Sequence, residues 1–208
     1  MKVRRSWTAA AALLVVSSVG GGLLLWHRAD APGPGQRPTA LIPTGECQGT
    51  LDDARFSEAL QSASTPTVRT DFTPPTQSAP AYPSCVVNGS DQRSLVATVV
   101  GTASEAERIH NEGQQVPRDY QPFSDGEAGD RSSVVRFSCV TRPAPDSPDH
   151  TWYYTAALNL HAPDNPAIPA PGRQKMAELS VALARQAVGK ALGCTNTIQL
   201  PDGPFTFT

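Results

Sequence analysis

The stretch "TWYYTAALNL", Thr151–Leu160, decides the fold, because apolar side chains alternate with others along it for the length of a strand. One face would hold the larger apolar side chains, namely Trp152, Tyr154, Ala156, Leu158 and Leu160. The other face would hold Tyr153, Thr155, Ala157 and Asn159. We therefore expect Trp152 and Tyr154 in the core, and favour this over a surface on which the aromatic run stacks a sugar or a peptide.

A second alternating stretch, "SVVRFSCV", precedes it at Ser133–Val140. Val135, Phe137 and Cys139 would share one face of this strand. The link at 142–150 is rich in proline, and its length suits an antiparallel pair joined by a long loop. Cys139 is then expected to point toward the core.

The segment "RQKMAELSVALARQAVGKALG", residues 173–193, has the spacing of a helix. Its apolar residues cover more than half of the helical circumference, which is typical of a helix that is mostly buried. Gly193 suits the C-terminal end of such a helix, and Cys194 follows it directly. We expect this helix to pack on the core face of the sheet.

A second helix is predicted after Cys47, with Thr50 at its N-terminal cap and an end near Ser64. Phe56, Ala59 and Leu60 recur in it at helical spacing. The carboxylates of the neighbouring Asp52 and Asp53 would favour a helix N-terminus electrostatically, and we prefer this interpretation to a catalytic pair.

The remaining elements are short. We expect a strand at Thr67–Phe72, and a hairpin that turns at Asn88-Gly89 between Cys85–Val87 and Arg93–Val100. One or two helical turns are expected within 104–113. Together these segments predict an α+β fold, with an antiparallel sheet of about 4–6 strands, two packed helices and one N-terminal transmembrane helix.

Four cysteines, at positions 47, 85, 139 and 194, are the only site residues that the sequence assigns. Their even number and wide spacing favour two disulfides in an oxidising compartment over four buried thiols. The predicted elements place Cys139 near Cys194, and Cys47, at a helix entrance, near Cys85, at a strand start. We therefore expect the pairs Cys47–Cys85 and Cys139–Cys194.

The N-terminus reads as a membrane anchor. Lys2, Arg4 and Arg5 precede an apolar run of 18 residues, Thr8–Leu25, which tryptophans flank on both sides. As a helix the run would be about 27 Å long, close to the ~30 Å of a hydrocarbon core. The positive charges predict a cytoplasmic N-terminus. A cleaved secretory signal, ending at Ala29-Asp30-Ala31, is the alternative, and it would give a secreted protein.

These features divide the chain into a cytoplasmic end (1–7), a transmembrane anchor (8–26), a Pro/Gly-rich tether (27–46) and an extracytoplasmic domain (47–208). Of the 17 basic residues, three precede the apolar run, whereas all 19 acidic residues follow it. The remainder therefore carries a net charge of −5, which disfavours nucleic-acid binding. The partners that we expect are the membrane, through the N-terminal helix, and an envelope protein or polymer.

No motif assigns a catalytic, cofactor-binding or metal-binding residue. G-x-S-x-G, S-x-x-K, H-E-x-x-H and the glycine-rich phosphate loops are absent from the sequence. The acidic segment 125–131 lacks the spacing of a calcium loop, and we interpret it as a surface loop. The histidines are scattered, at positions 27, 110, 150 and 161. Dispersed residues can still assemble a catalytic triad, so an enzyme is disfavoured without being excluded.

The charged residues are arginine-rich and lysine-poor, in a background of alanine, proline and glycine behind a basic, apolar leader. This style, with the ending "VGKALGC" at Val188–Cys194, resembles the small exported or membrane-anchored proteins of high-GC actinobacteria. The resemblance implies an extracytoplasmic location and assigns no functional residues. We expect a noncatalytic binding module at the cell envelope; an extracytoplasmic hydrolase is the alternative.

Overall fold

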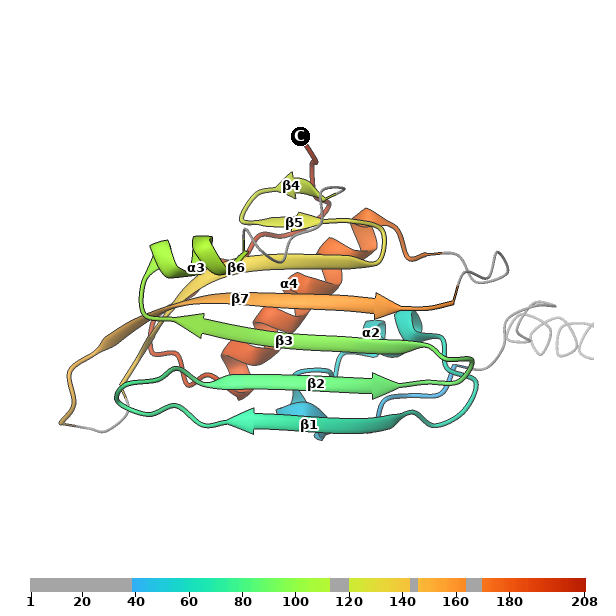
Figure 1. Cartoon of the computed structure of the whole chain (residues 1–208), viewed down its shortest axis with the longest axis horizontal. Coiled ribbons are helices and arrows are strands. Elements are labelled where there is room, and N and C mark those ends of the chain that lie inside the picture. Colours follow the sequence, from blue (N-terminus) through green and yellow to red (C-terminus); the bar gives the residue numbers. More distant parts are fainter. Residues whose placement is uncertain (1–38, 113–119, 143–145, 164–169) are drawn as a thin grey trace, which may run out of the picture. The chain divides into compact units, whose positions relative to one another are not determined.

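The computed structural model describes residues 39–112, 120–142, 146–163 and 170–208, and for 110–112 it describes the backbone alone. These residues form an α+β fold with one antiparallel sheet (Figure 1). The predicted transmembrane anchor, 8–26, lies outside the described residues, as does the tether up to residue 38. None of the helices in the described ranges combines the length and the apolarity needed to cross a bilayer.

The sheet has seven strands in the part of the chain that the structure describes, in the order β1-β2-β3-β7-β6-β5-β4. The strands are β1 (Thr67–Thr73), β2 (Tyr82–Asn88), β3 (Ser94–Thr102), β4 (Gln121–Phe123), β5 (Gly126–Ala128), β6 (Ser132–Thr141) and β7 (His150–His161). Two meanders, β1–β3 and β4–β7, meet where β3 pairs with β7. Seven strands exceed the predicted 4–6, mainly because residues 121–128, which include the start of the acidic segment 125–131, form the small hairpin β4–β5.

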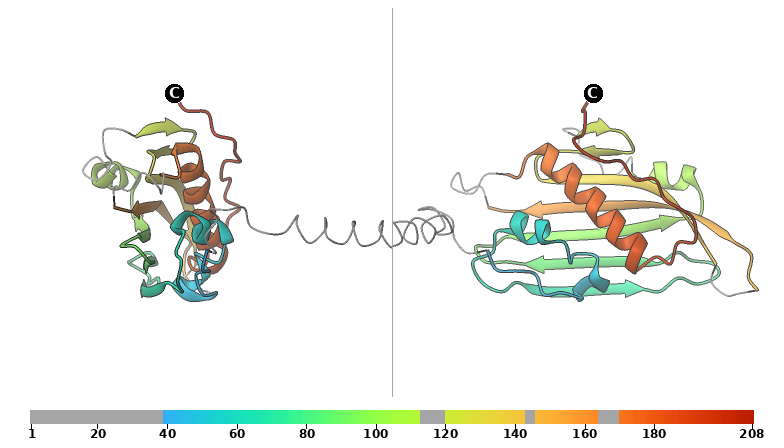
Figure 2. Two further views of the ribbon diagram at one scale, coloured as in Figure 1. Left: turned by 90° about the vertical axis from the view of Figure 1, so that its right-hand side faces the viewer. Right: turned by 180° about the vertical axis from the view of Figure 1, so that it is seen from behind.

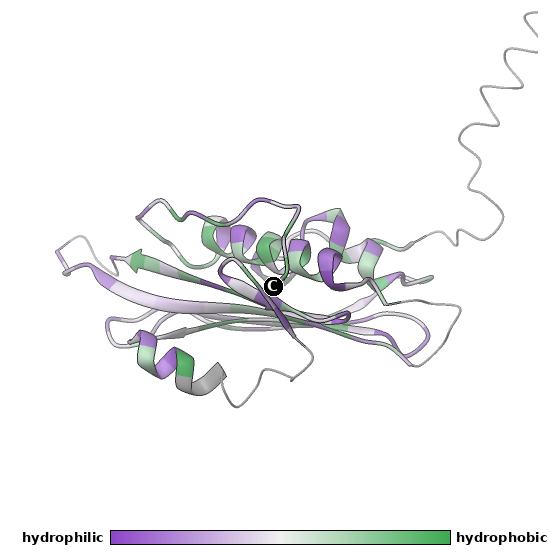
Figure 3. Cartoon of the chain, turned by 90° about the horizontal axis from the view of Figure 1, so that it is seen from above, coloured by the Kyte–Doolittle hydropathy of each residue, from purple (hydrophilic) through white to green (hydrophobic). Residues whose placement is uncertain are grey.

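Helices lie on both faces of the sheet. On one face α4 (Arg173–Lys190) crosses the strands diagonally, beside α2 (Ala54–Leu60) and the short 3-10 helix η1 (Glu46–Gly49) (Figure 2). On the opposite face α3 (Glu105–Glu112) packs against β3 and β7 (Figure 3). The two expected helices are thus present, and α3 corresponds to the helical turns expected near 104–113.

The core lies between the sheet and α4. The predicted alternation of β7 is confirmed: Trp152, Tyr154 and the other members of that face are buried, whereas Tyr153 and its neighbours are only half-buried. Tyr154 stacks on Phe137 of β6, with the ring centroids 5.5 Å apart. It also faces Gly101 of β3, where an added Cβ would lie 2.7 Å from the ring and 2.6 Å from Pro80. A glycine is therefore required at position 101 for this ring to fit.

The predicted start of the first helix is wrong. Asp53, not Thr50, is the N-terminal cap of α2, and its carboxylate accepts a hydrogen bond from the Arg55 amide at 3.0 Å. The Thr50 hydroxyl instead donates to the Cys47 carbonyl at 2.7 Å. The helix ends at Leu60, followed by Gln61 in the left-handed conformation, so it is shorter than predicted.

The hairpin β2–β3 is confirmed, but its turn lies farther along than predicted. Asn88 is the last residue of β2, and the left-handed residues of the turn are Asp91 and Gln92, with φ of 58° and 60°. Gly89 packs against the residues at the end of α2 and just after it, where an added Cβ would lie 3.0 Å from the Cβ of Ser62. The Asn-Gly pair thus serves a close contact, and Asp91 takes the turn conformation that aspartate tolerates.

A buried arginine joins this hairpin to α2. Arg93 is 1% exposed, and its guanidinium donates to the Ala59 carbonyl at 2.9 Å and to the Gln61 side chain at 3.3 Å. Burial lowers the pKa of Arg93. The partial negative charge of the helix C-terminus compensates the cation in part.

The described residues before η1 belong to the compact unit 39–208. Ile42 is buried, and its amide donates to the Ser57 hydroxyl at 2.9 Å. The Ala40 amide donates to the Ser62 carbonyl at 2.7 Å. The last residues of the predicted tether therefore pack on the domain.

Candidate functional site

A cleft of about 520 Å³ opens at the edge of the sheet, where β6 continues beyond the end of β5. Four segments that are distant in the sequence line it: α3, the β4–β5 turn, the middle of β6 with the adjacent residue of β7, and the chain after α4. The lining residues are Glu105, Arg108, Ser124, Asp125, Arg136, Phe137, Ser138, Tyr153, Asn196, Thr197, Ile198 and Gln199. Most of them carry hydrogen-bonding groups.

The β4–β5 hairpin forms one end of the cleft because its geometry stops β5 early. Gly126 pairs with Val135, and an added Cβ would lie 2.4 Å from the Val134 carbonyl and 2.5 Å from the Phe123 ring. Only glycine fits at such a close approach. The Asp125 carbonyl accepts a hydrogen bond from the Arg136 amide at 2.8 Å. This is the last hydrogen bond between the hairpin and β6.

The chain after α4 forms the other end. Gly193, with φ of 66°, lets the chain leave the helix, and Cys194 pairs with Cys139 of β6. The Thr195 amide donates to the Val140 carbonyl at 2.7 Å, and the Asn196 side chain accepts from the Val140 amide at 2.7 Å. The segment 195–196 therefore lies along β6 in the place where a further strand would pair.

An aromatic cluster holds the far end of the same segment. Phe205 and Phe207 pack on Phe123 of β4, with centroid distances of 4.8 and 5.8 Å. The Thr208 amide donates to the Pro122 carbonyl at 3.3 Å. The C-terminal wall of the cleft is thus fixed at both ends, by a disulfide and by aromatic packing.

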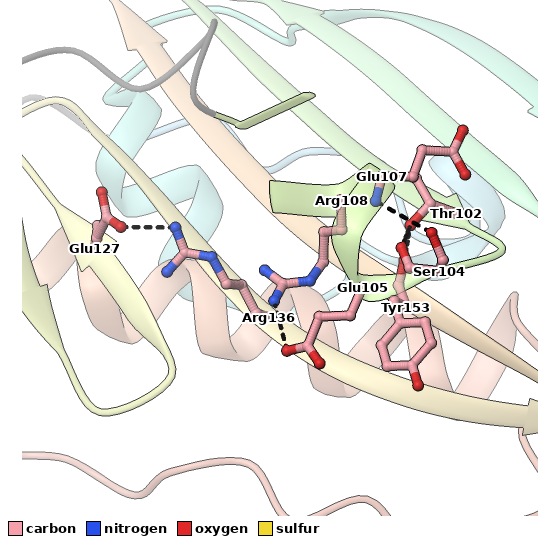
Figure 4. Close-up of polar contacts among 8 residues, drawn as sticks. All are labelled: Thr102, Ser104, Glu105, Glu107, Arg108, Glu127, Arg136 and Tyr153. Carbon is pink, nitrogen blue, oxygen red and sulfur yellow. Dashed lines mark hydrogen bonds and ion pairs between the residues drawn. The ribbon is translucent and has the colours of Figure 1, made fainter. Parts of the chain in front are cut away.

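Charges of both signs line the cleft (Figure 4). Arg136 forms an ion pair with Glu127 of β5 at 2.7 Å, and Arg108 forms one with Glu105 within α3 at 3.2 Å. The Arg108 side chain is only 11% exposed, so its charge is partly desolvated. The fixed guanidiniums can donate to acceptor oxygens on a ligand, and Tyr153 adds a ring and a hydroxyl.

The disulfide prediction is supported. Cys47 lies beside Cys85 with a Cα–Cα distance of 5.6 Å, and Cys139 lies beside Cys194 at 5.3 Å. These are the two pairs that the order of the elements favours, and the described residues hold no free cysteine. One pair joins η1 to β2, and the other joins the end of α4 to β6.

The histidines with described side chains lie far from each other along β7. His150 begins the strand and stacks near Trp152, whereas His161 ends it. His161 and Ser132 line a second cleft of about 290 Å³, which has no carboxylate among its lining residues. His27 and the His110 side chain lie outside the described part, and the hydrolase alternative stays a hypothesis.

The acidic residues considered for calcium do not converge. Asp125 lies in the β4–β5 turn, whereas Glu127, in β5, faces Arg136. Across the described ranges, no group of three or more histidine, cysteine, aspartate or glutamate side chains is placed to hold a metal ion.

Sequence reasoning missed the cleft residues Arg108, Arg136 and Asn196. Each looks like an ordinary surface residue in its own segment, and only the fold brings the three segments together. The one signal that pointed to this region is Cys194, whose predicted bond to Cys139 already required the chain after α4 to reach β6. A comparison of the chain with family models, curated proteins and solved structures finds no match.

Proposed function

We propose that residues 39–208 form a noncatalytic binding domain outside the cytoplasm, held at the cell surface by the N-terminal apolar helix, and that the cleft at the edge of β6 is its binding site. The apolar leader and the two cysteine pairs support the location. The cleft is the observation that carries the binding function, because four segments contribute fixed polar groups to it. The ligand is an envelope protein or polymer.

The composition of the cleft supports binding over catalysis. Both of its arginines are held in ion pairs, Arg108 with Glu105 and Arg136 with Glu127, an arrangement suited to recognition. Among the described residues that line it are two serines, but no histidine that could pair with a serine as in a serine hydrolase.

Photo-crosslinking in living cells tests the binding site. A photoreactive phenylalanine derivative replaces Tyr153 in the cleft, and in a control variant it replaces Tyr82, which lies on β2 away from the cleft lining. We expect a crosslinked product from position 153 that is absent from position 82. The product should decrease when Arg136→Gln is added, and it should persist with Arg69→Gln on the exposed edge strand β1. Equal products from both positions would refute the site.

The location is tested separately. Protease added to intact cells should digest the domain and leave a membrane-bound N-terminal fragment. N-terminal sequencing then distinguishes an anchored chain, which keeps its leader, from a secreted chain that begins after Ala31. Recovery of the intact chain in the cytosol, with all four cysteines open to alkylation, would contradict the proposed location.

A further inference from the structure

The edge of β6 already binds an amide group within this chain. The carboxamide of Asn196 accepts a hydrogen bond from the Val140 amide at 2.7 Å and donates one to the Ser138 carbonyl at 3.5 Å. A residue of a neighbouring strand would form the same kind of contacts through its backbone carbonyl and amide. Asn196 therefore takes the place of a peptide residue on this edge, and the cleft begins beside it.

The backbone amide of Ser138, which lies on the same edge of β6, points into the cleft. The amides of Arg136 and Val140 both leave the β6–β7 ladder, one toward Asp125 and the other toward Asn196. Successive amides of a strand point to opposite edges, so the Ser138 amide, midway between them, points the same way. The register of β6 on β7 is continuous across these residues. None of the groups in the described part of the chain accepts a hydrogen bond from the Ser138 amide.

Charge favours a ligand that is rich in amides over a strongly charged polymer. Two guanidiniums, of Arg108 and Arg136, and two carboxylates, of Glu105 and Asp125, line the cleft. Their formal charges cancel, so the cleft offers little net attraction to a polyanion or a polycation. Neutral backbone groups can bind to the edge of β6, while polar side chains reach the fixed charges on either side.

We propose that the cleft binds an extended peptide segment of a partner protein, which adds to the edge of β6 beside Asn196 and accepts the hydrogen of the Ser138 amide. This inference rests on the proposed function and names the class of its ligand. In this binding mode, backbone hydrogen bonds provide affinity, and side-chain pockets provide specificity. The Cys139–Cys194 bond fixes the neighbouring residue Asn196, so the edge is open only over the length of the cleft.

The test uses the full chain in detergent micelles and a random heptapeptide library displayed on phage. Peptides selected on the native chain are synthesised, and their affinities are measured for the native chain, Ser138→Ala and Ser138→Pro. Alanine keeps the amide hydrogen, whereas proline removes it at an edge position where proline is tolerated. Ser138→Ala is therefore the reference for the loss of the side chain, and we expect Ser138→Pro to bind about five- to tenfold more weakly than Ser138→Ala, as for one hydrogen bond.

A measurement on the native chain covers the case in which Ser138→Pro does not fold. Hydrogen exchange of the Ser138 amide, followed by NMR, should slow by at least about tenfold when a selected peptide saturates the protein. Selected peptides that leave this exchange unchanged, or that bind Ser138→Pro as tightly as Ser138→Ala, would overturn the proposal.

A second probe separates this inference from the proposed function. Glycan fragments from digested cell wall are titrated into the native chain and into Arg136→Gln. If no heptapeptide binds but the glycans bind and depend on Arg136, the peptide inference fails and the binding site stands. If neither probe binds in the cleft, and the crosslink at Tyr153 is also absent, both proposals fail.

Discussion

Removing the Cys139–Cys194 bond should lower stability and disturb the cleft together. The perturbation is the double substitution Cys139→Ala and Cys194→Ala. Its matched control is Cys47→Ala with Cys85→Ala, which removes the other pair, away from the cleft lining. Both pairs join a helical element to a strand, so the two variants differ mainly in what lies beside the lost bond.

The magnitude follows from the lengths of the two loops. The sequence separations are 55 residues for Cys139–Cys194 and 38 residues for Cys47–Cys85. Loop-closure entropy then gives about 4 kcal/mol of stabilisation for each bond at 25 °C. For a domain of this size, 1 kcal/mol corresponds to roughly 2–4 °C in Tm. Each variant should therefore unfold about 8–16 °C below the native chain.

Urea denaturation of the full chain, followed by tryptophan fluorescence, measures the loss for each variant. We expect similar losses for the two variants, but weaker binding of selected heptapeptides only for the Cys139/Cys194 variant, because Asn196 follows Cys194 by two residues. The two loops do not overlap, so the two contributions should add, and reductant should lower the free energy of unfolding of the native chain by about 8 kcal/mol. This loss is comparable to the whole stability of a typical domain. Unfolding midpoints that neither the substitutions nor reductant change would refute the reasoning.

Three further predictions concern single side chains. Gly101→Ala should lower the free energy of unfolding by about 1–3 kcal/mol in thermal melts, because the added methyl group overpacks a buried tyrosine and a proline. Its control is Gly189→Ala in α4, which has open space around the added Cβ and should be neutral or stabilising. Arg93→Met keeps the apolar stem but leaves a helix-end carbonyl without its donor, so chemical denaturation should show a loss of about 1–3 kcal/mol; unchanged stability would mean that the cap is unimportant. The hydrogen bond from Lys190 holds the pKa of Asp52 below its ordinary value of 3.8, so this pair stabilises the folded state above that pH and the effect is lost as pH falls through the lowered pKa. Asp52→Asn should therefore be less stable than the native chain at pH 7 and equal to it in strong acid, and a difference in stability that persists at pH 2 would contradict this assignment.

The sequence predicted those parts of the fold in which one segment carries a complete pattern. Alternation over Thr151–Leu160 suffices to orient β7, and the broad apolar arc of 173–193 suffices to bury α4. The cysteine pairs follow because each cysteine lies at the end or on the inward face of such an element. Strong local patterns of this kind are preserved when the chain packs.

The rest could not be predicted because it depends on contacts between distant segments. The three-residue strands β4 and β5 contain a proline and a glycine and show no alternation, and Phe123 is held by Phe205 from the other end of the domain. Arg93 is charged and would be expected on the surface, yet the end of α2 supplies its acceptors. The cleft combines four such segments, so no local signal could indicate it.

The pairing of β3 with β7, which joins the two meanders, has a consequence for folding during synthesis. During synthesis, residues 67–102 emerge and can complete the first meander well before β7 exists. In that interval β3 presents an open edge of nine residues to the surroundings. Such an edge invites pairing with another nascent copy, which is a route to aggregation. The yield of native protein would then rise if β7 is synthesised and paired quickly, or if a chaperone covers the edge of β3 until β7 is present.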